Sequence, residues 1–132
     1  MLPLVIMTAI ALAPFAERAT RFEDLGRLRV QECERVVALR TELTKCGAKV
    51  IEEGDTLTVF PSALHAAEIE TYHDHRMAMC FAVLGLKVPG IKIKNPVRPL
   101  QGHSIMKFLL VISIHMISSI SISTRFCLPI PL

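Results

Sequence analysis

The sequence predicts a small α/β domain in which helices pack on a sheet. Three observations support this prediction: an apolar pattern of helical period over residues 30–46, two alternating segments joined at Gly54-Asp55, and a second helical pattern after Asp74. The 132 residues suffice for one domain or for part of a larger one. With 52% hydrophobic and 20% charged residues, the composition excludes intrinsic disorder and a collagen-like repeat.

The first helix is expected at residues 5–16, where apolar residues predominate. Pro3, Pro14, Glu17 and Arg18 interrupt this stretch before it reaches the length that spans a bilayer, and no basic segment precedes it as in a signal peptide. We therefore expect neither a membrane helix nor a leader here.

An amphipathic helix is expected next, over residues 30–46. Charged residues separate its apolar positions, which are Val30, Cys33, Val36, Val37, Leu43 and Cys46. Gly47 follows, where glycine commonly ends a helix. Residues 48–54 and 55–60 then predict two short strands joined by a tight turn at Gly54-Asp55.

The remaining elements are a strand, a helix and a strand. EIETY, residues 68–72, has the composition of a strand, and Asp74 is a typical N-cap for the helix that follows. The apolar positions of that helix are Met77, Met79, Cys80, Phe81 and Leu84. Pro89-Gly90 ends it, and IKIKNP at residues 91–96 alternates as a strand.

Composition changes near Pro96, so we predict two regions, a domain at residues 1–96 and a divergent apolar tail at residues 97–132. The domain region holds 12 basic and 12 acidic residues, whereas the tail has three basic residues, no acid and no alanine. Residues 105–123 approach the length of a membrane helix, but Lys107, His115 and several serines argue against a span. The tail is otherwise strand-like, or non-native sequence that follows a truncated coding region.

Charge and cysteine usage restrict the partners and the compartment. The domain region is neutral and its charges are scattered, so no nucleic-acid partner is expected. The four cysteines are dispersed and form no CxxC pair, which favours a reduced, cytoplasmic setting.

Two patches, LRVQECER at residues 28–35 and TYHDHRMAM at residues 71–79, place charge where helices begin. Helix amino termini attract anions, and guanidinium groups bind phosphate or carboxylate bidentately, so Arg35 and Arg76 are candidate anion ligands. Glu32, close to such cations, is a candidate proton donor and acceptor. The alternative is that all three are solvated residues in surface ion pairs.

No metal site is expected, although His73, Asp74 and His75 are ordinary ligand types. Adjacent side chains at a helix start diverge, and no third ligand follows at a characteristic spacing. Cys33 and Cys80 are expected on apolar helix faces, as core residues rather than nucleophiles.

Three stretches together resemble the carboxy-terminal part of the 5-enolpyruvylshikimate-3-phosphate synthase family. They are MTAIALAPFAERAT, LRVQECERVVALRTELTKCGAKVIEEGDTLTV and IETYHDHRMAMCFAVLGLKVPGIKIKNP, and the resemblance covers residues 3–96. The pairing of an RVKETDR-like helix start with DHRMAM is more specific than either string alone. Enolpyruvyl transferases that act on UDP-N-acetylglucosamine share the fold without the DHRMAM signature, and they rank as a distant second family.

The resemblance implies an inside-out α/β barrel built from βαβαββ units, of which this chain supplies about one. It also implies a transferase of aromatic amino-acid (chorismate) biosynthesis, which moves the carboxyvinyl group of phosphoenolpyruvate to the 5-hydroxyl of shikimate 3-phosphate and releases phosphate. The implied partners are these two substrates, and no metal or organic cofactor is implied.

Site residues follow from the resemblance position by position. Glu32 matches the glutamate that handles the proton at the methylene carbon, and Arg35 and Arg76 match the arginines that hold phosphoenolpyruvate. Asp74 and His75 match the acid and the histidine beside that pocket, where they orient the arginine.

Departures from the family pattern affect the shikimate-phosphate side. Gln31 stands where the family has a lysine that contacts that substrate, Cys33 replaces a threonine, and Leu4 replaces the aspartate that takes the hydroxyl proton. The Lys-Thr-Phe-Pro segment expected after Asn95-Pro96 is absent. We therefore expect no turnover by this chain alone, and self-association through exposed sheet edges. The alternative is a non-catalytic chain that binds another protein, or a membrane through residues 105–123.

Overall fold

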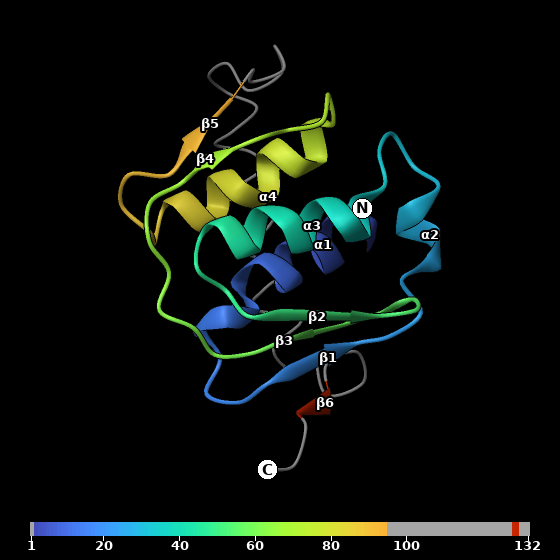
Figure 1. The fold of residues 1–132 in the computed structure, drawn as a ribbon. Coiled ribbons are helices and arrows are strands. Elements are labelled where there is room, and N and C mark those ends of the chain that lie inside the picture. The colour runs from blue at the N-terminus through green and yellow to red at the C-terminus, as the bar shows by residue number, and fades with distance from the viewer. Residues whose placement is uncertain (1, 95–127, 130–132) are drawn as a thin grey trace.

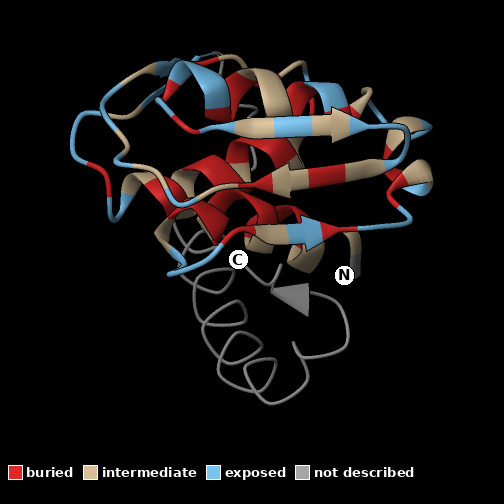
Figure 2. Cartoon of the chain, turned by 60° about the horizontal axis from the view of Figure 1, so that its bottom comes forward, coloured by how far each residue is buried: buried red, intermediate tan, exposed pale blue. Residues whose placement is uncertain are grey.

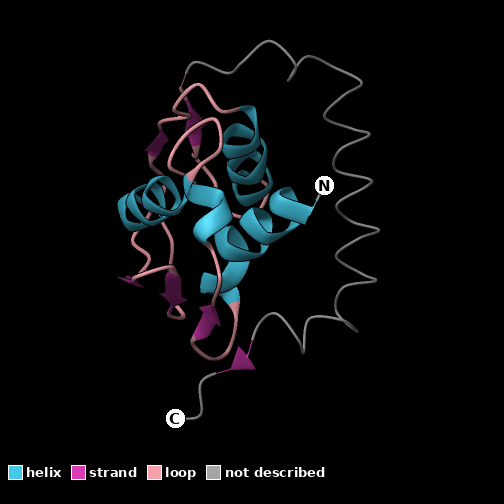
Figure 3. Ribbon diagram, turned by 90° about the vertical axis from the view of Figure 1, so that its right-hand side faces the viewer, coloured by secondary structure: helices cyan, strands magenta, loops and turns pink. Residues whose placement is uncertain are grey.

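The computed structural model describes residues 2–94 and 128–129. The elements, in chain order, are α1 (Leu2–Leu12), the 3-10 helix η1 (Ala13–Phe15), β1 (Thr20–Phe22), α2 (Gly26–Arg29), α3 (Arg35–Lys45), β2 (Val50–Glu53), β3 (Thr56–Val59), β4 (Glu68–Ile69), α4 (His75–Gly85), β5 (Lys92–Ile93) and β6 (Leu128–Pro129). Helices α1, α3 and α4 lie between the two groups of strands, as Figures 1 and 3 show from two sides.

Two sheets are present among the described residues. The larger has the strand order β2-β3-β1-β6, and each neighbouring pair is antiparallel. Because β1 and β2 both run antiparallel to β3, they are parallel to each other, and α2 and α3 form the crossover between them. In the smaller sheet, β4 and β5 are parallel and α4 connects them. The predicted α/β class is confirmed.

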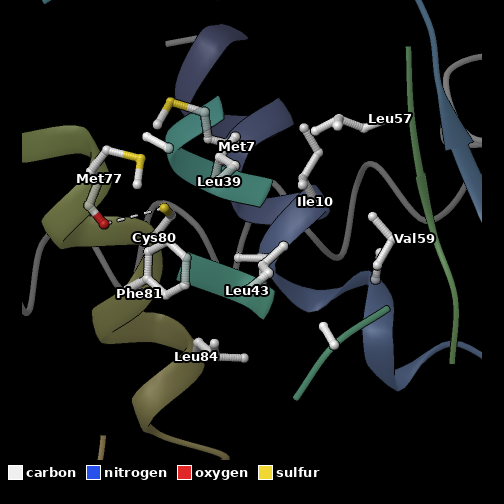
Figure 4. Close-up of a cluster of buried hydrophobic side chains, with 14 of the residues drawn as sticks. Met7, Ile10, Leu39, Leu43, Leu57, Val59, Met77, Cys80, Phe81 and Leu84 are labelled. Carbon is white, nitrogen blue, oxygen red and sulfur yellow. Dashed lines mark hydrogen bonds between the residues drawn. The ribbon is translucent and has the colours of Figure 1, made fainter. Parts of the chain in front are cut away.

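The hydrophobic core lies between the large sheet and the helices. Alternation along β3 turns Leu57 and Val59 toward the helices, where both are fully buried. Figure 4 shows them facing Ile10 and Leu43, with Phe81 of α4 completing the cluster. The opposite face of this sheet is more exposed, as the strands in Figure 2 show. One layer of helices therefore packs between the two sheets.

The hairpin forms where the sequence predicts it, and the first helix overlaps the range predicted at residues 5–16. β2 and β3 pair in register from Val50↔Val59 to Glu53↔Thr56, so Gly54 and Asp55 make the turn, and Gly54 adopts a positive φ of 57°. Helix α1 starts earlier than expected, because Pro3 falls in its first turn, where its missing N–H costs nothing.

Helix α3 begins five residues later than predicted. Val30 is not helical and is 80% exposed, and a loop over residues 30–34 separates α2 from α3. The helix starts at Arg35 because Glu34 caps it: the Glu34 side chain accepts a hydrogen bond from the Val36 N–H. The spacing of Val30 and Cys33 thus matched the helical period by coincidence.

The strands predicted at residues 68–72 and 91–96 are shorter in the structure. β4 and β5 pair over two residues each, Glu68↔Lys92 and Ile69↔Ile93. The first cannot continue, because Tyr72 and His73 both take positive φ and turn the chain toward α4.

Within residues 2–94, no helix is long and apolar enough to cross a membrane. The predictions for residues 105–123 lie outside the described residues. Of the tail, the structure describes β6, which pairs with the free edge of β1.

Two adjacent valines of α3 test the packing of the core. Val36 is fully buried, whereas Val37 is 37% exposed on the same helix. Val36→Ala should lower the free energy of unfolding by about 2 kcal/mol, because two buried methyl groups are lost. Val37→Ala should change it by less than about 0.5 kcal/mol. Urea unfolding followed by circular dichroism measures both, and equal effects would contradict this packing.

Candidate active site

The two charged patches meet where α3 and α4 begin. Arg35, the first residue of α3, places its Nε 2.6 Å from Oδ2 of Asp74 and its Nη2 3.3 Å from Oδ1. Both side chains are buried, at 1% and 0% exposure. Asp74 is also the predicted N-cap of α4, since its Oδ1 accepts the Arg76 N–H at 2.9 Å. One buried ion pair therefore fixes the two helix starts against each other.

Asp74 is held as a carboxylate. Burial alone would raise its pKa, but hydrogen bonds from the Arg35 guanidinium and the Arg76 N–H outweigh that effect and hold the pKa of Asp74 below its usual value. Arg35 uses Nε and Nη2 for this contact, while its buried Nη1 has no hydrogen-bond partner among the described residues. A buried, unpaired guanidinium N–H is a donor suited to an anion.

Glu32 and His75 lie at the more exposed side of this pair. Glu32 Oε2 is 3.4 Å from His75 Nδ1, and the two side chains are 49% and 40% exposed. The Arg76 side chain is half-buried and forms no ion pair or hydrogen bond with the described residues. Glu32, Arg35, Asp74, His75 and Arg76 are thus brought together from segments about forty residues apart.

Gln31 is placed differently from the other candidates. It is exposed, and its Nε2 donates to the carbonyl oxygen of Arg27 at 3.2 Å. Within the described residues, the Gln31 side chain forms no hydrogen bond with the other five candidate residues.

Cys33 corrects one sequence expectation. It lies in the loop before α3, half-buried, and its Sγ donates to Asp74 Oδ2 at 3.4 Å. Burial, together with the hydrogen bond to Asp74 and its negative charge, raises the pKa of Cys33 to about 12. Cys33 is therefore a neutral thiol that supports Asp74. Cys80, in contrast, is fully buried on the apolar face of α4 as predicted.

Glu32, Asp74 and His75 place possible metal-ligand atoms within 4.8 Å of one another. The expectation from sequence spacing considered neighbouring residues and missed Glu32, which arrives from another element. Both Asp74 oxygens already accept hydrogen bonds, and the Arg35 charge lies against them. Such surroundings favour an anion over a cation.

The backbone that leads into α4 is strained. Tyr72 and His73 have φ values of 55° and 54°, a region that costs non-glycine residues on the order of 1–3 kcal/mol each. The turn closes with a hydrogen bond from the Asp74 N–H to the Thr71 carbonyl oxygen. Sequence reasoning missed this turn, because EIETY has strand composition and no glycine marks the left-handed positions.

Glu42 is a second residue that the sequence analysis missed. This buried glutamate of α3 accepts hydrogen bonds from the Glu70 N–H at 2.6 Å, from Tyr72 Oη at 3.2 Å and from Lys45 Nζ at 2.8 Å. The available signal was a charged residue at a position where the helical period requires burial.

Arg29 closes the loop that carries Gln31 and Glu32. Its guanidinium reaches Glu34 at 3.0 Å, Glu52 at 2.8 Å and Asp55 at 2.8 Å, and it also donates to the Gly54 carbonyl oxygen. These carboxylates raise the pKa of Arg29. Since Glu34 also caps α3, Arg29 ties the end of α2, the start of α3 and the β2–β3 turn together.

Comparison with known proteins gives consistent matches. The profile of the family described as EPSP synthase (3-phosphoshikimate 1-carboxyvinyltransferase) matches residues 1–98. A 3-phosphoshikimate 1-carboxyvinyltransferase of Nostoc punctiforme is 49% identical over 92 residues, which are 70% of this chain and 22% of the relative. That of Sodalis glossinidius is 47% identical over 97 residues, 72% of this chain and 22% of the relative.

Among solved structures, EPSP synthase from Acinetobacter baumannii aligns with a TM-score of 0.62 and 25% identity, over 82% of this chain and 24% of that chain. The chain thus spans about a fifth of the length of the proteins it matches.

Tyr72 gives a direct test of the contacts around this site, because it is the chain's single tyrosine. Burial, followed by the charge and the hydrogen bond of Glu42, raises its pKa to about 12. Tyrosinate absorbance should therefore rise near pH 12 in the folded chain and near pH 10 in urea. Since the folded chain holds the proton more tightly, stability should fall between these pH values. A folded-state transition near pH 10 would contradict the Tyr72–Glu42 contact.

Proposed function

The chain belongs to the EPSP synthase family, and on this premise we propose that the starts of α3 and α4 form the phosphoenolpyruvate-binding part of a carboxyvinyl transferase site. The proposed reaction joins the carboxyvinyl group of phosphoenolpyruvate to the 5-hydroxyl of shikimate 3-phosphate and releases phosphate. The observation that carries the proposal is Arg35, a buried arginine that is oriented by Asp74 and whose Nη1 has no hydrogen-bond partner among the described residues.

Arg35 and Arg76 bind the anionic substrate in this proposal. Asp74 fixes the guanidinium plane of Arg35, so its free edge is already oriented when the substrate arrives, and little side-chain freedom is lost. Arg76 is the second residue of α4 and adds a second positive charge. The amino terminus of α4, with its positive end of the helix dipole, favours the same ligand. Together they suit a phosphate or carboxylate.

Glu32 transfers the proton in this proposal. Protonation of the methylene carbon by Glu32 lets the 5-hydroxyl oxygen add to the neighbouring carbon, while a base from outside this chain takes the hydroxyl proton, and a tetrahedral intermediate results. Phosphate then leaves as the methyl group returns a proton to Glu32, which restores the vinyl group. Glu32 is half-exposed, and its Oε2 lies 3.4 Å from Nδ1 of His75. These steps call for no cofactor.

The shikimate-phosphate side is incomplete in this chain. Gln31 provides a hydrogen-bond donor but no positive charge where the family has lysine, and Leu4 offers no base for the hydroxyl proton. The chain spans 22% of its curated relatives, so residues from the rest of such a protein are required for a complete site. We therefore propose a half-site that binds phosphoenolpyruvate. The cytoplasmic setting also stays a proposal, supported by the free thiols of Cys33, Cys46 and Cys80.

A titration of phosphoenolpyruvate into the purified chain tests the half-site. Saturable binding is expected by calorimetry or by chemical-shift perturbation, and Arg76→Ala should weaken it at least about tenfold because a charge-assisted hydrogen bond is lost. Arg18→Ala is the matched control, since Arg18 is exposed and distant in sequence from both patches. Equal affinity in both variants, or no binding by the unmodified chain, would refute the proposal.

Turnover is a separate prediction. The chain alone should release no phosphate from a mixture of phosphoenolpyruvate and shikimate 3-phosphate, because the second substrate lacks its base and its cation. A coupled phosphate assay measures this, with Glu32→Ala as the control for contaminating enzyme. Phosphate release that disappears in Glu32→Ala would show that the chain is an active transferase.

A further inference from the structure

The segment between β4 and α4 needs an external restraint. Tyr72 and His73 are consecutive non-glycine residues in the left-handed region, which an isolated chain rarely adopts. Asp74 follows this turn directly and forms the buried ion pair with Arg35. A relaxation of this turn to ordinary φ values would redirect the chain at Asp74 and move the start of α4.

Glu42 supplies contacts to both sides of that turn. Its Oε1 accepts the Glu70 N–H at 2.6 Å, two residues before Tyr72, and its Oε2 accepts the Tyr72 hydroxyl at 3.2 Å. The Glu42 carboxylate is fully buried. Lys45, on the surface of the same helix, balances its charge, with Nζ 2.8 Å from Oε1. The two hydrogen bonds, one to the backbone and one to a side chain, hold the segment in one conformation.

Arg35 and Glu42 act from the same face of α3. They are seven residues apart, so the helical period places them on one side, roughly 10 Å apart along the axis. Arg35 contacts Asp74 and Glu42 contacts Glu70 and Tyr72. α3 therefore holds the segment 70–74 at both of its ends.

We propose that Glu42 is a positioning residue for the candidate active site, which holds the left-handed turn at Tyr72 and His73 and thereby sets Asp74 against Arg35. The contacts of Glu42 are independent of the proposed function, whereas its role in substrate binding rests on that function. Glu42 touches no substrate in this proposal, because it is buried behind the turn. Its effect on binding passes through the orientation of Asp74 and Arg35.

The test uses the full 132-residue chain and the exchange of labile protons followed by nuclear magnetic resonance. The Arg35 Nε–H, bonded to Asp74, reports on the site, and the amide of Leu43, a fully buried residue in the last turn of α3, reports on global opening. Four variants are compared: Glu42→Ala, Glu42→Gln, Tyr72→Phe and the control Glu53→Gln. Glu53 is an exposed glutamate of β2.

Glu42→Ala should speed exchange at the Arg35 Nε–H by about tenfold more than at Leu43, the order expected when one or two hydrogen bonds are lost. Tyr72→Phe should show the same selective change to a smaller extent. Glu42→Gln should stay within about twofold of the unmodified chain, because an amide can accept from the Glu70 N–H and donate to the phenolic oxygen. Glu53→Gln should change neither rate.

Exchange that rises equally at both protons, or that changes at neither in Tyr72→Phe and Glu42→Ala, would overturn the proposal and leave Glu42 as a core residue. If Glu42→Ala does not fold, the selective change in Tyr72→Phe decides alone. If the chain binds phosphoenolpyruvate, the dissociation constants of the four variants should rank in the same order as their exchange rates at the Arg35 Nε–H. Where it does not bind, the half-site proposal fails, and the exchange result still decides the role of Glu42.

Discussion

The ion pair of Arg35 and Asp74 is the interaction on which the other features of the site depend. A buried charge is tolerated only where a partner and further hydrogen bonds compensate its lost hydration. Here the carboxylate has Arg35, the Arg76 N–H and the Cys33 thiol, and it is also the cap of α4. Loss of either partner would leave an uncompensated charge in the core, so the pair holds the starts of α3 and α4 together.

Hydrogen bonds and ion pairs next to this contact position the segments that lead into both helices. Arg29 closes the loop before α3 through Glu34, which in turn caps the helix. On the other side, Glu42 restrains the turn before α4. The hydrophobic layer of α1, α3 and α4 supplies the stability that allows a strained turn and a buried charge to persist. The chain concentrates its unusual features at the point where the two helix starts meet.

Local sequence patterns predicted the elements well where one physical requirement dominated. The hairpin at Gly54-Asp55 and the cap at Asp74 each depend on a residue type with a specific backbone role, and both were found. The start of α3 was misplaced, because Val30 and Cys33 imitate the helical period while the capping Glu34 is not a typical N-cap residue. The proximity of Glu32 to His75 and the role of Glu42 come from tertiary contacts between distant segments, which periodicity does not encode.

The sequence separation within the Arg35–Asp74 pair has a thermodynamic consequence. The two residues are 39 positions apart, so the pair exists only when the helices have docked and the intervening hairpin has formed. A ligand that binds there recognises the folded chain and not the unfolded ensemble. Its binding free energy is therefore added to the folding equilibrium, and the melting temperature becomes a function of ligand concentration. Occupancy of the site and folding of the chain are then two coupled equilibria.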